Sequence, residues 1–117
     1  MGLSTHVLDT MHGTPAAGMA VALYAMGSGA PVLVRRLVLN ADGRNPDGPL
    51  YDDAGLKAGT YRLVFGVADY FRAKGVQLPD PPFLDQVSLD FGVADAAQHY
   101  HVPLLVSPWS YSTYRGS

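Results

Sequence analysis

The sequence predicts an all-β protein, a sandwich of short strands with one short helix. Its 117 residues suit one domain, and 48% of them are hydrophobic, so we expect a buried core. The 13 glycines and 9 prolines are spread along the whole length and separate short apolar runs. Such spacing is typical of many strands joined by turns, and we expect residues 1–117 to form a single domain.

Apolar runs in the first half of the chain predict five strands, of which one is weak. Turn residues end the first three at His12–Pro15, Gly27–Gly29 and Asp42–Gly43. The last of the five alternates, which places every second side chain on one face of a sheet. In chain order, the expected strands are Leu3–Asp9, Met19–Met26, Pro31–Asn40, the weak Leu50–Asp53, and Thr60–Gly66.

A short helix is expected at Asp69–Gly75, where the strand period gives way to about two helical turns. Asp69 suits an N-cap and Gly75 suits the end of the helix. The proline-rich residues 79–82 then prevent regular structure. After them we expect strands at Gln86–Val93, Gln98–Ser107 and, beyond Pro108, Trp109–Arg115.

Composition excludes several classes of function. The net charge is −2, and the eight lysines and arginines are scattered, which argues against a nucleic-acid partner. The absence of cysteine excludes disulfides and thiol catalysis. No apolar run could span a bilayer, and the N-terminus lacks the pattern of a secretion signal. We therefore expect a cytoplasmic protein that binds no membrane.

The four histidines are the first candidates for chemistry, because histidine is the commonest acid–base residue. His6 lies within a predicted strand, and His99 and His101 are two apart on another, so they share a face. Most strand histidines are structural, and His12 is expected to be a solvated turn residue. His99, His101 and His6 could together bind a metal, but this motif is a weak signal, and we expect no metal.

Arg44 and the C-terminal segment are further candidates. Arg44 follows a turn at Asn40–Gly43, and its planar guanidinium suits a carboxylate or adjacent ring carbonyls; a surface arginine is an equal alternative. Residues 107–117 are rich in aromatic and hydroxyl side chains, unlike most chain ends. Strand alternation permits a common wall carrying His6, His101 and Tyr114, with His99 as a supporting candidate. An edge strand that packs a dimer is the structural alternative for the segment.

Several segments together resemble the signature of the 5-hydroxyisourate hydrolase family, which is related to transthyretin. They are Leu3–Asp9 (LSTHVLD), Asn40–Arg44 (NADGR), His99–Pro108 and the terminal Tyr114–Ser117 (YRGS). Two positions depart from the family pattern: Leu39, where threonine is frequent, and Trp109, where tyrosine or phenylalanine is usual. Neither position is among those to which the family's chemistry maps.

The resemblance implies a transthyretin-like sandwich of two four-stranded sheets, assembled as a homotetramer. This tetramer is a dimer of dimers, with active sites where the dimers meet. It implies hydrolysis of 5-hydroxyisourate to 2-oxo-4-hydroxy-4-carboxy-5-ureidoimidazoline in urate breakdown, without a cofactor. The family's catalytic set maps onto His6, Arg44 and His101. Its substrate-binding residues map onto His6, Arg44, Tyr114, Arg115, Gly116 and Ser117.

Direct attack by water is the simplest mechanism, because no serine or cysteine nucleophile lies in a recognisable elbow. We expect His6 and His101 to share the base and acid roles and Arg44 to stabilise negative charge. The main alternative is a transthyretin-type carrier of a small hydrophobic ligand, since one fold can serve both functions. A structural immunoglobulin-like domain is a third reading, but the Cys…Trp…Cys pattern is missing.

Overall fold

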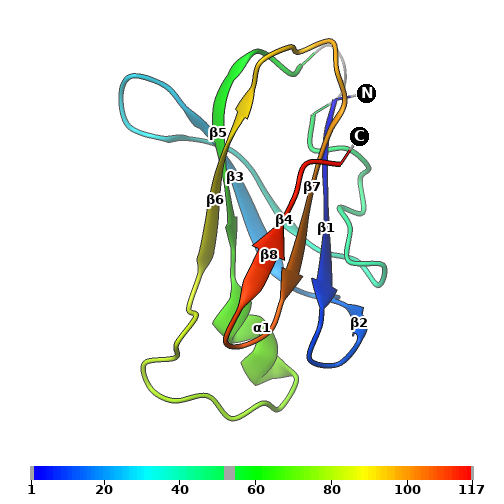
Figure 1. The fold of residues 1–117 in the computed structure, drawn as a ribbon, viewed down its shortest axis with the longest axis vertical. Coiled ribbons are helices and arrows are strands. Elements are labelled where there is room, and N and C mark those ends of the chain that lie inside the picture. Colours follow the sequence, from blue (N-terminus) through cyan, green and yellow to red (C-terminus); the bar gives the residue numbers. More distant parts are fainter. Residues whose placement is uncertain (1, 52–54, 117) are drawn as a thin grey trace.

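The computed structural model describes residues 2–51 and 55–116, which form two sheets packed face to face (Figure 1). The elements are β1 (Leu3–Asp9), β2 (Thr14–Pro15), β3 (Ala20–Met26), β4 (Val32–Val38), β5 (Gly59–Phe65), α1 (Val67–Ala73), β6 (Val87–Val93), β7 (Tyr100–Val106) and β8 (Tyr111–Thr113). The first sheet has the strand order β2-β1-β7-β8 and the second β4-β3-β5-β6. The predicted sandwich of two four-stranded sheets with one short helix is confirmed.

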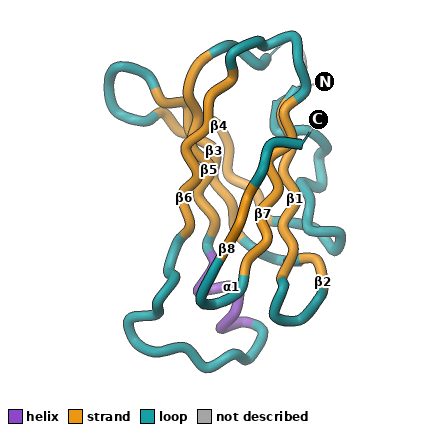
Figure 2. Tube along the Cα trace, in the orientation of Figure 1, coloured by secondary structure: helices purple, strands orange, loops and turns teal. Residues whose placement is uncertain are grey.

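Most connections lie at the two ends of the sandwich, whereas the long segment between β4 and β5 runs along β1 (Figure 2). Helix α1 lies at one end, while the start of β1 and the residues after β8 lie near each other toward the opposite end. In the described part of the chain, no helix is long and apolar enough to cross a membrane.

Two predicted boundaries are wrong. The expected turn at His12–Pro15 ends in strand β2, because Thr14 and Pro15 pair with the end of β1. Helix α1 begins before Asp69, with Gly66 at its N-cap and no side-chain cap. Asp69 instead lies in the first turn, where its negative charge still interacts favourably with the helix dipole.

Two predicted strands are shorter than expected. The weak strand at Leu50–Asp53 is reduced to a bridge between Leu3 and Tyr51, while its residues 52 and 53 lie outside the described residues. The last strand covers only Tyr111–Thr113, so Tyr114 lies beyond the regular ladder. Only short edge segments are affected, and the central strands stand close to their predicted positions.

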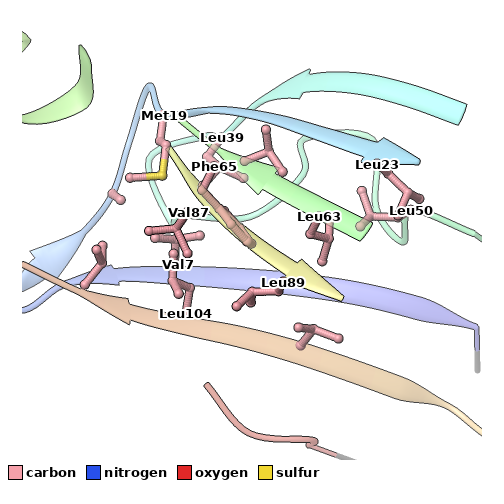
Figure 3. Packing of buried hydrophobic residues seen from close by; sticks show 14 of the residues in the cluster. Val7, Met19, Leu23, Leu39, Leu50, Leu63, Phe65, Val87, Leu89 and Leu104 are labelled. Carbon is pink, nitrogen blue, oxygen red and sulfur yellow. The ribbon is translucent and has the colours of Figure 1, made fainter. Parts of the chain in front are cut away.

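Strands β1 and β7 form a parallel pair at the centre of the first sheet. Strand β1 alternates in burial, and β7 does so except at the buried Pro103, so that Val7 and Leu104 face the second sheet while His6 and His101 face outward. The inward side chains meet large apolar residues of the second sheet, including Phe65 (Figure 3). Burial of each such side chain contributes about 1.5–3 kcal/mol, and this contribution holds the two strands with their histidines outward.

The end of β1 is fixed by a buried carboxylate. The Asp9 side chain has no exposed surface, and it accepts hydrogen bonds from the His12 backbone N–H (3.0 Å), the His12 Nδ1 (2.6 Å) and the Tyr70 hydroxyl (2.8 Å). Burial alone would raise the pKa of Asp9, but these hydrogen bonds hold it below its ordinary value of 3.8. His12 is therefore more than a solvated turn residue, because its ring ties the turn to β1.

We predict that Tyr70→Phe lowers the free energy of unfolding by about 2 kcal/mol at pH 7, because it removes a hydrogen bond to a buried charged group. Urea denaturation of the variant and the parent protein measures the difference. Tyr24→Phe, which removes a hydroxyl from the outer face of β3, is the matched control. Equal stability of the Tyr70 variant and the control would contradict the role given to this contact.

Candidate functional site

The outward face of the first sheet brings His6 and His101 together. In the parallel register Ser4 lies opposite His101, and His6 lies opposite Pro103, so the two histidines stand one rung apart on the same face. Their ring centroids are 6.5 Å apart. Two imidazoles at this separation can both contact one small substrate.

Arg44 joins this face through a turn. The Asn40 side-chain oxygen accepts hydrogen bonds from the backbone N–H groups of Asp42 (2.9 Å) and Arg44 (3.1 Å), which confirms the predicted turn. An antiparallel bridge then joins Arg44 to His6. The Arg44 Nη2 lies 3.4 Å from the His6 Nδ1, so the exposed guanidinium stands beside the imidazole.

Gly43 permits this close approach. Its φ of +73° is in the left-handed region, and a Cβ there would stand 2.5 Å from the Val7 carbonyl oxygen. The Gly43 carbonyl accepts a hydrogen bond of 3.0 Å from the Val7 N–H. A larger residue at position 43 would therefore push the turn, and Arg44 with it, away from β1.

Ser4 is a polar residue of this face that the sequence analysis did not single out. Its Oγ lies 2.8 Å from the His101 Nδ1 and 3.2 Å from the His99 Nε2. The sequence alone places Ser4 two residues before His6, on the same face of β1. The missing information was the register of β1 against β7, which sets Ser4 opposite His101.

The predicted site residues at the C-terminal end have different surroundings. Gly116 exchanges two backbone hydrogen bonds with His101, of 2.7 and 3.2 Å, and a Cβ on it would stand 3.1 Å from the His101 ring. Tyr114 is 61% exposed. Arg115 points elsewhere, because its guanidinium lies 4.2 Å from the centre of the Tyr100 ring and donates to Gln98. Ser117 lies outside the described residues.

Both facing histidines favour the neutral form. Burial lowers the pKa of His6 below 6.5, and the positive charge of Arg44 lowers it further, while a backbone hydrogen bond at Asp42 opposes them. Burial also lowers the pKa of His101, followed by repulsion from Arg44, His6 and His99. At neutral pH each ring therefore has one unprotonated nitrogen, which a general base requires.

This face is open in the single chain. A hollow of about 680 Å³ lies on the outer face of the second sheet, and one of about 300 Å³ lies between strands β6 and β8. Neither is lined by His6, Arg44 or His101. Within the described ranges, no group of three or more histidine, aspartate or glutamate side chains has the geometry to hold a metal ion.

Comparisons with known proteins point to one family. Residues 3–116 match the family model described as the HIUase/Transthyretin family. The chain is 58% identical over 115 residues to 5-hydroxyisourate hydrolase 2 of Rhizobium meliloti, covering 98% of this chain and 95% of that protein.

Two solved structures share the fold. One is (S)-allantoin synthase, with a TM-score of 0.93 and 44% identity, which covers 99% of this chain; this chain spans only 43% of that longer one. The other is sea bream transthyretin in complex with thyroxine, with a TM-score of 0.86 and 27% identity, covering 99% of this chain and 95% of that chain.

We predict that Arg44→Gln raises the pKa of both His6 and His101, because it removes a positive charge that disfavours their protonated forms. Arg44→Lys, which keeps the charge, is the matched control and should leave both pKa values lowered. NMR titration of the histidine ring signals measures the effect. Unchanged titration in the Gln variant would show that Arg44 does not act on either ring.

Proposed function

The chain belongs to the HIUase/Transthyretin family, and on that basis and the geometry of the histidine face we propose that it is a 5-hydroxyisourate hydrolase of urate catabolism. One observation carries the proposal furthest. Two imidazoles with lowered pKa values and the Arg44 guanidinium converge on one face of the first sheet, and among the described residues Arg44 forms no salt bridge to a carboxylate. Hydrolysis of a cyclic amide requires these kinds of group.

The three side chains divide the work of hydrolysis. One histidine removes a proton from water as the water attacks the ring carbonyl, and the other supplies a proton or hydrogen bond to the departing group. Arg44 binds substrate oxygens and stabilises the negative charge that develops on the attacked carbonyl. Gly116 supports His101 from the backbone, and the exposed Tyr114 remains a predicted substrate-binding residue.

The carrier alternative has weaker support. The chain is 58% identical to the bacterial hydrolase but 27% identical to the transthyretin that was solved with thyroxine. A carrier of a hydrophobic ligand has no need of paired imidazoles beside an arginine, whereas a hydrolase does. Arg115 and Ser117 remain predicted substrate-binding residues. The guanidinium of Arg115 contacts Tyr100 and Gln98 in the single chain.

We further propose that the active protein is a homotetramer, a dimer of dimers with sites where the dimers meet. Strands β6 and β8 are edge strands of their sheets, and the smaller hollow lies between them. Two edge strands are therefore close together and available to pair with a second copy of the chain. The open histidine face would then need a facing dimer, because binding sites usually bury most of a small ligand. A single domain and a cytoplasmic location likewise stay predictions.

We predict that His6→Ala and His101→Ala each reduce turnover of freshly generated 5-hydroxyisourate by about 100- to 10,000-fold, the usual cost of removing a general acid or base. Loss of the ultraviolet absorbance of the substrate measures the rate. All assays contain EDTA, since the proposed site uses no metal. His12→Asn, which keeps a side-chain donor for Asp9, is the control, because His12 lies away from this face. Near-normal turnover of either site variant would remove that residue from the site.

We predict that deletion of Tyr114–Ser117 abolishes hydrolysis while the sandwich remains folded. The deletion removes both backbone hydrogen bonds between Gly116 and His101, and it removes the Tyr114 side chain, but it leaves strand β8 intact. Turnover is measured beside circular dichroism and size-exclusion chromatography, which report folding and assembly. A correctly assembled truncation with full activity would show that the segment serves packing alone.

A further inference from the structure

The Ser4 hydroxyl stands between two imidazoles. Its Oγ is 2.8 Å from the His101 Nδ1 and 3.2 Å from the His99 Nε2, and all three side chains are partly buried on the outward face of the first sheet. The His101 Nε2 is thereby the ring nitrogen left free of Ser4. The three groups form a chain of hydrogen bonds that ends beside His6, whose ring centroid is 6.5 Å from that of His101.

A serine hydroxyl has one proton to donate and two lone pairs that accept. Among the described residues the Ser4 Oγ has no hydrogen-bond partner besides the two imidazoles, so its proton is used only when it is donated to one of them, which leaves two arrangements. In one, Ser4 donates to the His101 Nδ1 and accepts from a proton on the His99 Nε2. In the other, both hydrogen bonds run in the opposite direction. The tautomers of His99 and His101 are therefore linked, although each ring alone could adopt either.

The other nitrogen of His99 favours the first arrangement. The His99 Nδ1 is buried and has no hydrogen-bond partner among the described residues. In the second arrangement the neutral His99 ring would carry its proton on this nitrogen, which would bury an N–H group without an acceptor. In the first arrangement the nitrogen keeps a bare lone pair, and unpaired acceptors are tolerated better than unpaired donors.

We propose that Ser4 and His99 are positioning residues that hold neutral His101 with its proton on Nε2. The hydroxyl of Ser4 donates to the His101 Nδ1 and is oriented by the proton on the His99 Nε2. Gly116 stands behind the same ring, close enough that a Cβ would touch it, so the imidazole is held by hydrogen bonds on one edge and by packing.

This assignment rests on the proposed function and deepens it by separating the two histidines. His101, with an N–H at Nε2, donates a hydrogen bond to the departing group, a role that a neutral imidazole can fill, and the proton that His6 takes from water passes to the departing nitrogen. The unprotonated nitrogen that activates water is then supplied by His6. The contact of 3.4 Å from Arg44 to the His6 Nδ1 is long for a hydrogen bond, so it is easily exchanged for a contact to substrate.

The direct test is NMR of the complete protein labelled with ¹⁵N at its histidines. Long-range proton–nitrogen correlations at pH 7.5 distinguish the two tautomers of each ring. We expect the Nε2–H form for His101 in the parent protein and a mixture of tautomers in Ser4→Ala, while the His12 signals stay unchanged. The Nδ1–H form in the parent protein, or an unchanged tautomer in Ser4→Ala, would overturn the proposal.

Kinetics provide the second measurement. Ser4→Ala and His99→Phe should each lower kcat by about 10-fold, the value expected for one lost hydrogen bond, with less change in KM. Ser4→Thr and His99→Gln keep the required donors and should restore most of the rate, and Ser28→Ala, at an exposed serine between β3 and β4, is the matched control. Equal loss in Ser4→Ala and Ser4→Thr would show that the position serves packing alone. A parent protein that fails to hydrolyse 5-hydroxyisourate would defeat the proposed function, while the tautomers would still decide the role of Ser4.

Discussion

The parallel pairing of β1 with β7 is the constraint on which the rest of the structure depends. Every other strand pairing in the described residues is antiparallel. This one joins residues nearly a hundred positions apart, and its register alone sets Ser4 opposite His101. A shift of one residue would turn His101 toward the core relative to His6 and would separate the groups that converge on the outward face.

Strand β1 serves stability on one face and the proposed chemistry on the other. Its inward residues include Leu3, Val7 and the carboxylate of Asp9, which ties the strand to the turn at His12 and to Tyr70 of the helix. Its outward residues include Ser4 and His6. Because apolar burial and the Asp9 hydrogen bonds fix the strand, the outward side chains stand on a rigid element, and a site on rigid elements is held more accurately than one on loops.

Backbone bridges complete the site from both sides. Arg44 pairs with His6, and Gly116 pairs with His101, so two irregular segments are attached to the two central strands. In both places a glycine allows the approach: Gly43 fits against the Val7 carbonyl, and Gly116 fits against the His101 ring. The resulting face is polar and partly exposed in the single chain.

The sequence by itself determined the sandwich, the central strands and the outward phase of His6 and His101, because strand alternation and turn residues are local properties of the chain. It also determined the turn that presents Arg44, since asparagine, aspartate and glycine favour that geometry wherever they occur together. Only the tertiary structure decided that Ser4 contacts two histidines, that Arg115 lies on Tyr100 instead of facing His101, and that His12 binds a buried carboxylate. These facts depend on the register between distant strands and on which side chains meet across a packed interface, and neither quantity is encoded in the period of a single segment.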